Sequence, residues 1–207
     1  MVSRKELKQM SRMQIGGKLG ILFLAGFIAC AIMYGLASPF ILEEIKANIA
    51  GQIPPRYTVL SNVIFLILQP AFTIGYLRMY LSIANHEKPA IRDLFSGFKI
   101  WGASFRLGIF ISLFTLLWTL LLIIPGIIKA ISYSMAFYVL AEKPHLLAKE
   151  ALNESKRITA GHKMELFVLG LSFIGWILLC AFTLGIAGIY VIPYMNATYT
   201  NFYNKIK

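Results

Sequence analysis

Charged residues and cysteines are both scarce in this chain of 207 residues. Only 14% of the residues are charged, compared with roughly 25% in a typical soluble domain, and 58% are hydrophobic. The two cysteines, Cys30 and Cys180, lie inside apolar runs, where cysteine behaves as a small hydrophobic residue. The composition therefore excludes a soluble globular domain and indicates a membrane protein, with no disulfide framework and no Cys/His metal site.

Residues for catalysis are also poorly represented. All nine acidic residues fall in polar segments or at the ends of apolar runs, whereas proton relays and many ion-coupled carriers hold a carboxylate inside the membrane. The three histidines, His86, His145 and His162, lie in polar segments too, and no zinc-protease, nucleophile-elbow or phosphate-loop motif occurs. We therefore expect no catalytic residues, no metal and no cofactor.

Four long apolar runs define the architecture. Residues 20–42 and 58–80 each have the length of one membrane span of about 20 residues. Residues 104–141 and 166–203 would each form about 57 Å of helix, against a hydrocarbon core of about 30 Å. Each longer run fits two spans, with turns at Pro125-Gly126 and near Gly185 and Gly188; re-entrant halves are the alternative. These runs predict six transmembrane helices in three hairpins.

A basic amphipathic segment precedes each predicted hairpin. The three segments are residues 3–18, in which Gly16-Gly17 closes the predicted helix, residues 85–103 and residues 142–165. The second has the clearest apolar face, which consists of Ile91, Leu94, Phe95, Phe98 and Trp101. Such segments are typical of helices that lie in the membrane interface.

The Lys and Arg residues are distributed very unequally between the two sides of the predicted membrane. Seventeen lie on the side of the two termini, and only Lys46, Arg56 and Lys129 lie on the other side. Because cytoplasmic loops carry the excess of Lys and Arg, we expect a cell membrane protein with both termini in the cytoplasm. The net charge of +11 thus favours anionic lipid headgroups as partners, and it is not a nucleic-acid signal.

A local pattern recurs three times along the chain. Glu87-Lys88-Pro89 recurs as Glu142-Lys143-Pro144, and Tyr76 and Tyr80 follow Pro70 at the same offsets at which Tyr199 and Tyr203 follow Pro193. Pro125 with Tyr133 and Tyr138 is a looser third copy, and chance matches in a biased composition are the alternative. The pattern predicts an all-α polytopic bundle, one integral membrane domain over residues 1–207, with a quasi-threefold repeat of units at about 1–84, 85–141 and 142–207.

Polar side chains inside the predicted spans form the first candidate site. Lys129 is the one charge between Leu107 and Ala141, and its ammonium either reaches the headgroups or faces the bundle interior, where it would attract an anion. We expect Pro70, Pro125 and Pro193 to line a common central region, because proline frees backbone carbonyls. The candidate intramembrane polar site consists of Lys129, Tyr133, Gln69, Tyr76, Asn196 and Tyr199.

A second candidate lies at the predicted cytoplasmic face and consists of Ser155, Lys156, Gly161, His162 and Lys163. Together with Ile124-Pro125-Gly126-Ile127-Ile128-Lys129 and the segment 171–176, this motif resembles an uncharacterised family of bacterial integral membrane proteins, found mainly in Gram-positive organisms. The resemblance implies a polytopic membrane protein of unknown function without assigned catalytic residues. A weaker similarity links its organisation to the membrane portion attached to some glycerophosphodiester phosphodiesterases, whose catalytic domain has no room in this chain.

These features favour one function over two others. The favoured function is a non-enzymatic membrane protein that binds lipid or a partner protein in an accessory, scaffold or immunity-type role. The alternative is a small carrier or channel that uses a central cavity for an anionic or lipid-like substrate, and the least favoured is an intramembrane lipid-modifying enzyme. A polar central cavity would support the carrier, whereas a filled centre would support the first function.

Overall fold

The computed structural model describes residues 3–50 and 55–207, and this part of the chain is helical, without strands. The helices vary in length from one turn to about eight. Their bounds are α1 (Arg4–Ile15), α2 (Leu19–Ile49), α3 (Pro55–Ala84), α4 (Ile91–Leu94), the 3-10 helix η1 (Phe95–Ile100), α5 (Trp101–Leu121), α6 (Ile123–Tyr133), α7 (Ala136–Glu142), α8 (Ala148–Thr159), α9 (Lys163–Leu171), α10 (Ile174–Phe182) and α11 (Gly188–Ile206).

Glycines with positive φ stand at three of the turns between helices. Gly17 separates α1 from α2 with φ 74°, Gly161 separates α8 from α9 with φ 85°, and Gly185 separates α10 from α11 with φ 89°. A residue with a Cβ is disfavoured in this conformation, so glycine allows the chain to reverse there. The turns at Gly17 and Gly185 lie where the sequence predicts them.

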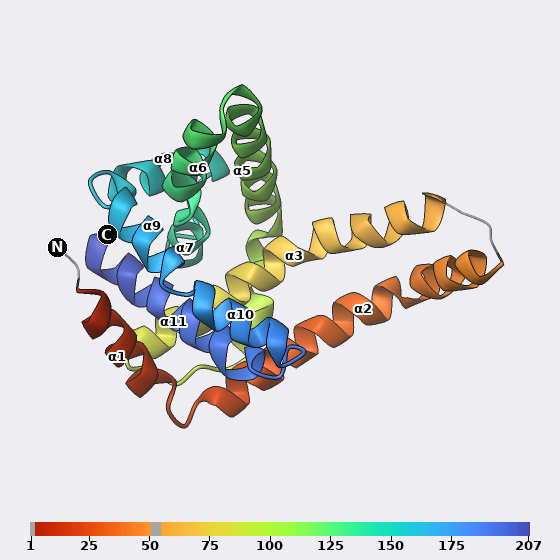
Figure 1. Ribbon diagram of the computed structural model, residues 1–207, viewed down its shortest axis with the longest axis horizontal. Coiled ribbons are helices and arrows are strands. Elements are labelled where there is room, and N and C mark those ends of the chain that lie inside the picture. The colour runs from red at the N-terminus through yellow and green to blue at the C-terminus, as the bar shows by residue number, and fades with distance from the viewer. Residues whose placement is uncertain (1–2, 51–54) are drawn as a thin grey trace.

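Two helix pairs extend away from the rest of the molecule (Figure 1). One pair is α2 with α3 and the other is α5 with α6, and in each pair the two helices lie side by side. We call these pairs the arms. Their outer surface is apolar and open, since Leu120 and Ile124 at the end of the second arm are 75% and 72% exposed. Exposed apolar surface on this scale is the surface that lipid covers in a membrane protein.

A second group of elements, which includes one end of α3, forms a densely packed region that we call the base. It consists of α1, residues 71–84 of α3, α4, η1, α7, α8 and residues 191–206 of α11. The base holds large aromatic side chains that are at most 1% exposed, namely Tyr80, Tyr194, Phe202 and Tyr203. The hydrophobic core of the described chain is therefore concentrated in the base.

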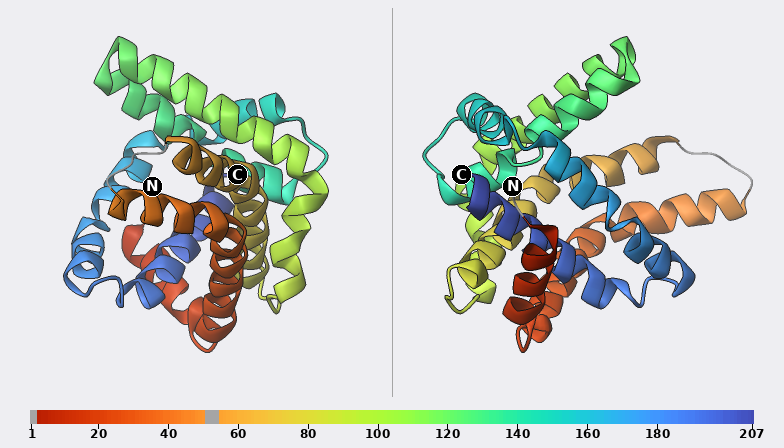
Figure 2. Two further views of the ribbon diagram at one scale, coloured as in Figure 1. Left: turned by 90° about the vertical axis from the view of Figure 1, so that its right-hand side faces the viewer. Right: turned by 60° about the vertical axis from the view of Figure 1, so that its left-hand side comes forward.

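The helices of the base contact one another in a regular order. α4 and η1 pack on α3, α8 packs on α6 and α7, and α1 packs on α11. Figure 2 shows that last contact, in which the beginning of the chain lies beside its end. α3 also contacts both α7 and α11. Each of these three amphipathic elements thus rests on a helix from a different part of the chain.

Two glycines allow η1 and α3 to approach each other very closely. A Cβ added to Gly97 would lie 1.9 Å from the carbonyl oxygen of Ala71, and one added to Gly75 would lie 1.8 Å from the carbonyl oxygen of Leu94. Both distances are far below van der Waals contact, and the atoms met belong to the backbone, which has no rotamer to change. The packing of α4 and η1 against α3 therefore depends on these two glycines.

Five helical segments are long and apolar enough to cross a membrane, whereas the sequence predicts six spans. The five are Leu19–Ala47, Val59–Ala84, Ile91–Leu121, Ile123–Glu142 and Lys163–Phe182. The expected sixth is α11, which does not meet these criteria among the described residues. Its C-terminal half carries Thr198, Thr200 and Asn201, whose side chains are buried within the base. A protein environment thus replaces lipid around that half of the helix.

Two local predictions also need correction. The chain between α5 and α6 breaks at Leu122, which is extended with φ −158°, and not at Pro125-Gly126. Pro125 instead lies in the first turn of α6, where its missing N–H costs no hydrogen bond. The second amphipathic segment begins at Ile91 and is one turn of α-helix followed by η1, and its buried Leu94 faces protein rather than lipid.

Candidate functional site

Cationic side chains that lack an acidic partner gather on α1. Arg4, Lys5, Lys8 and Arg12 have no carboxylate within 4.0 Å among the residues that the structure describes. Lys8 is partly buried, donates to the carbonyl oxygen of Ser172 over 3.2 Å and lies 4.5 Å from the centre of the Phe173 ring. Burial and the nearby charges of Arg12 and Arg4 lower the pKa of the Lys8 ammonium below its usual value.

The carboxylates of the base, by contrast, already have partners. Glu6 pairs with Lys205 at 3.4 Å, and Glu142 accepts hydrogen bonds from Tyr203 and Lys207. Glu154 pairs with Arg157 at 2.8 Å and with Lys143 at 3.3 Å. The hydrogen bonds from Arg157, supported by those from Lys143, lower the pKa of Glu154 to about 2. The base therefore carries excess positive charge that its own carboxylates do not neutralise.

Gln69 and Tyr76, two residues of the predicted intramembrane site, line the same pocket. This pocket has a volume of about 510 Å³, lies between α2, α3 and α11, and is lined mainly by apolar side chains, with Pro193 on its α11 side. Tyr76 donates a hydrogen bond to the carbonyl oxygen of Leu22 over 3.0 Å, so its hydroxyl joins α3 to α2. The pocket thus offers mostly apolar surface, with Gln69 and Thr73 as its other polar side chains.

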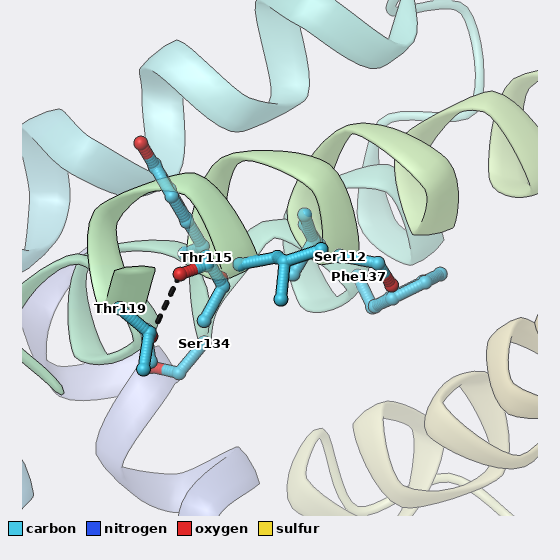
Figure 3. A pocket seen from close by; sticks show the side chains of 9 residues that line it. Ser112, Thr115, Thr119, Ser134 and Phe137 are labelled. Atoms are coloured by element: carbon cyan, nitrogen blue, oxygen red, sulfur yellow. Dashed lines mark hydrogen bonds between the residues drawn. The ribbon is translucent and has the colours of Figure 1, made fainter. Parts of the chain in front are cut away.

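Tyr133 lies in a different pocket, of about 540 Å³, between α5 and the end of α6 (Figure 3). Hydroxyl groups from both sides line it, including those of Ser112, Thr115, Thr119 and Ser134. The Thr119 hydroxyl donates to the carbonyl oxygen of Thr115 over 2.8 Å, which is the dashed line in Figure 3. The Thr119 and Ser134 hydroxyls bond to nearby carbonyl oxygens of the same chain segment and need no ligand, whereas the Thr115 hydroxyl is buried and has no hydrogen-bond partner among the described residues.

The other three predicted residues line neither pocket. The Lys129 ammonium lies 4.7 Å from the centre of the Trp118 ring on α5, Asn196 donates to the carbonyl oxygen of Ile192 over 3.0 Å, and the Tyr199 ring packs near Phe173. The structure therefore distributes the six residues over separate places in the described chain. Neither pocket includes Pro70 or Pro125 among its lining residues.

The centre of the base is occupied by tyrosine rings from three helices. Tyr80 of α3, Tyr138 of α7 and Tyr203 of α11 are 1%, 7% and 1% exposed. Tyr138 and Tyr203 stack with ring centres 5.6 Å apart, and Tyr76 packs edge-on against Tyr80 at 5.2 Å. These rings fill the space between α3, α7 and α11 in the base.

The predicted cytoplasmic-face motif connects α8 to its neighbours. The Ser155 hydroxyl donates to the carbonyl oxygen of Ser132 on α6 over 2.8 Å, and Lys156 lies 5.5 Å from the centre of the Tyr133 ring. His162 occupies the N-cap position of α9 without a capping side-chain hydrogen bond, and its Nδ1 lies 3.1 Å from Glu165. Gly161 provides the turn, and Lys163 begins α9. Ser155, Lys156 and His162 of the motif therefore have structural contacts, and Gly161 shapes the turn between α8 and α9.

Two residues that sequence reasoning missed hold the base together. Arg78 on α3 donates to the carbonyl oxygens of Ala141 at 3.0 Å and Ser96 at 3.3 Å. Asn201 on α11 donates to the Ser11 hydroxyl at 3.0 Å and to the side-chain Oε1 of Gln14 at 2.7 Å. A signal was present, because Arg78 and Asn201 lie eight residues after Pro70 and Pro193, in line with the repeated tyrosines.

Comparison of the sequence with known protein families gives one match. The model of the family described as proteins of unknown function, DUF975, matches residues 1–132 and 119–207. The chain belongs to the DUF975 family. No curated protein and no solved structure matches it. Among the described residues of this DUF975 chain, no three His, Cys, Asp or Glu side chains come close enough together to hold a metal ion.

Proposed function

We propose that the chain is a non-enzymatic multi-pass protein of the cell membrane whose base faces the cytoplasm and binds anionic lipid headgroups. Its role would be that of an accessory, scaffold or immunity-type protein that presents this base to lipid or to a partner protein. The observation that carries the proposal is the group of cations on α1 without carboxylate partners, beside helices whose apolar surface is open. Lys and Arg next to an anionic membrane surface each contribute about 1 kcal/mol to binding.

The filled centre of the base supports this function over a carrier or channel. Tyr80, Tyr138 and Tyr203 occupy the place where three helices meet, and a conduction path for an ion needs polar groups or water there. The pockets described above lie beside this centre, between α2, α3 and α11 and between α5 and α6. Neither contains a carboxylate that could couple transport to an ion gradient.

A quasi-threefold arrangement of three hairpins, each preceded by an amphipathic helix, is part of the proposal. The order of the elements supports it: α1 precedes α2 and α3, α4 with η1 precedes α5 to α7, and α8 precedes α9 to α11. The contacts support it as well, because each amphipathic element packs on the last helices of the preceding unit, and α1 packs on those of the third unit. In this arrangement α11 is the sixth membrane-crossing segment.

A further sequence pattern supports the same repeat. A serine is followed six residues later by a glycine in each amphipathic segment, as Ser11 and Gly17, Ser96 and Gly102, and Ser155 and Gly161. Ser11 and Ser155 are both fully buried, and Gly17 and Gly161 both have positive φ. Gly102 differs because α5 continues through it.

The orientation can be tested by cysteine labelling. In a chain that lacks Cys30 and Cys180, single cysteines at Ser96 and Asn153 should react with a membrane-impermeant maleimide only after the cells are opened. A cysteine at Leu184, in the turn before α11, should react in intact cells. This follows from the strong asymmetry of Lys and Arg. Labelling of Ser96→Cys or Asn153→Cys in intact cells would contradict the proposed orientation.

The function itself can be tested with purified protein. After reconstitution in nanodiscs of mixed lipid, we expect phosphatidylglycerol to be enriched over phosphatidylcholine around the protein, and the enrichment to fall at high salt. In parallel, proteoliposomes should show no protein-dependent flux of anions or labelled lipid. Flux above that of empty liposomes would favour the carrier, and equal retention of both lipids would refute headgroup binding.

A further inference from the structure

A pocket of about 740 Å³ lies between α1, which belongs to the base, and α9. One wall is the first turns of α1, and the other is a face of α9. Its lining residues include both charged and apolar side chains: Ser3, Arg4, Lys5, Lys8, Met164, Glu165, Val168 and Ser172. This pocket is separate from those that hold the predicted site residues.

The α1 wall of the pocket is strongly positive. Arg4, Lys5 and Lys8 line it, and the single acidic lining residue, Glu165, already contacts His162 at 3.1 Å. The Lys8 ammonium is fixed by its hydrogen bond to the carbonyl oxygen of Ser172, which leaves further N–H groups free to donate. Burial, followed by repulsion from the nearby charges of Arg12 and Arg4, lowers the pKa of Lys8. An anion in the pocket would relieve this repulsion.

The α9 wall of the pocket is apolar and leads out of it. Met164 and Val168 line the pocket and lie on one face of α9, and Leu171 continues that face one turn later. Met164 is 70% exposed and Leu171 is 46% exposed, so this strip is open to lipid. A free phosphate ion would use only the cations, whereas a phospholipid would use the cations and the strip.

We propose that the pocket between α1 and α9 binds the phosphate headgroup of one anionic phospholipid, with its acyl chains along the exposed face of α9. The inference rests on the proposed function, because it needs the base at the level of the headgroups. Arg4 provides a planar fork for a phosphate, and Lys5 and Lys8 provide compact charges. The site differs from the rest of the cationic base in having a cavity and an adjoining apolar strip.

The test compares two double variants of the full-length protein that remove the same charge from the base. Arg4→Ala with Lys5→Ala removes two exposed cations of the pocket, and Arg92→Ala with Lys99→Ala removes two exposed cations on α4 and η1. Native mass spectrometry of each protein in detergent, titrated with phosphatidylglycerol, phosphatidylcholine or inorganic phosphate, measures what stays bound. Circular dichroism and thermal unfolding confirm that each variant is folded.

We expect the wild type and the Arg92/Lys99 variant to retain one phosphatidylglycerol that phosphatidylcholine does not replace. The Arg4/Lys5 variant should bind this lipid about 30-fold more weakly, as expected for the loss of two headgroup contacts. Equally weakened binding of phosphatidylglycerol in both variants would overturn the proposed lipid site in the pocket but leave the proposed function intact. If none of the three proteins prefers phosphatidylglycerol, the proposed function is refuted. If only inorganic phosphate is retained, the lipid proposal is overturned, and the ligand of the pocket is a free anion.

Discussion

The arms and the base are built from the same kinds of apolar residue but are stabilised in different ways. In the base, Phe202 is 1% exposed and lies among buried tyrosines, whereas Phe27 on α2, in the first arm, is 62% exposed. The base also joins its helices by long-range hydrogen bonds such as those of Arg78 and Asn201. Protein contacts therefore hold the base together, while the arms depend on the surrounding lipid.

Removal of one phenylalanine from each region should give the largest contrast. We expect Phe202→Ala to lower the free energy of unfolding by about 4 kcal/mol, because it leaves a cavity in the base. Phe27→Ala, in the first arm, should change it by less than about 0.5 kcal/mol because that ring is mostly exposed. Titration of the protein in mild-detergent micelles with SDS measures both values. Similar losses for the two variants would show that the base is not the more stable region.

A smaller loss of stability is expected when an added side chain disturbs the close approach of η1 to α3. Gly97→Ala places a Cβ against the carbonyl oxygen of Ala71 and should cost about 3 kcal/mol, because backbone has to move. Gly102→Ala, five residues later, meets no atom within 4 Å and lies in a helix, so it should be neutral or slightly stabilising. The same SDS titration compares them. A tolerated alanine at 97 would mean that η1 packs less closely than described.

Arg78 on α3 and Arg106 on α5 should also differ in how much each stabilises the folded protein. Arg78→Ala leaves the carbonyl oxygens of Ala141 and Ser96 without their donor and should cost about 2 kcal/mol. Arg106 is exposed and donates to Gly102 within its own helix, so Arg106→Ala should cost less than about 0.5 kcal/mol. Thermal unfolding followed by tryptophan fluorescence would rank the variants, and an equal shift for both would exclude the bridging role of Arg78.

The smallest effect concerns acid stability of the base. Because the pKa of Glu154 is lowered to about 2 from the usual value of 4.5 for a glutamate, ionised Glu154 stabilises the folded state above pH 4.5. This contribution is lost as the pH falls from 4.5 towards 2, and its size should be below about 1 kcal/mol because Arg157 is exposed. Glu154→Gln should flatten the stability profile over that range. An unchanged profile would show that the ion pairs contribute nothing.

The sequence was sufficient for the helical character, the apolar runs and several turns. Gly17 and Gly185 could be recognised because a turn with positive φ strongly favours glycine. The break at Leu122 could not be predicted, because leucine carries no such signal and Pro125 is equally suitable within the first turn of a helix. The position of a turn can therefore be predicted from the sequence only where its backbone conformation strongly favours one residue type.

The candidate site was harder to predict than the fold. Gln69 and Tyr76 share a pocket, but Lys129 lies against Trp118 and Tyr133 faces α5, because the two arms extend separately. Sequence spacing reports which face of a helix a residue occupies, whereas the neighbour of that face depends on tertiary packing. The role of α1 was missed for the same reason, since its partner α11 lies at the other end of the chain.

The contact of α1 with α11 has a consequence for biosynthesis. Asn201 lies 190 residues after its partner Ser11, so ribosomes that add 5–20 residues per second need roughly 10 to 40 s to complete the pair. During that interval α1 is already made, whereas the helix that covers its buried face does not yet exist. Its basic residues and apolar side chains suit a temporary position on the membrane surface. α1 is thus made well before it acquires its final neighbours, and the base can close only after α11 has been synthesised.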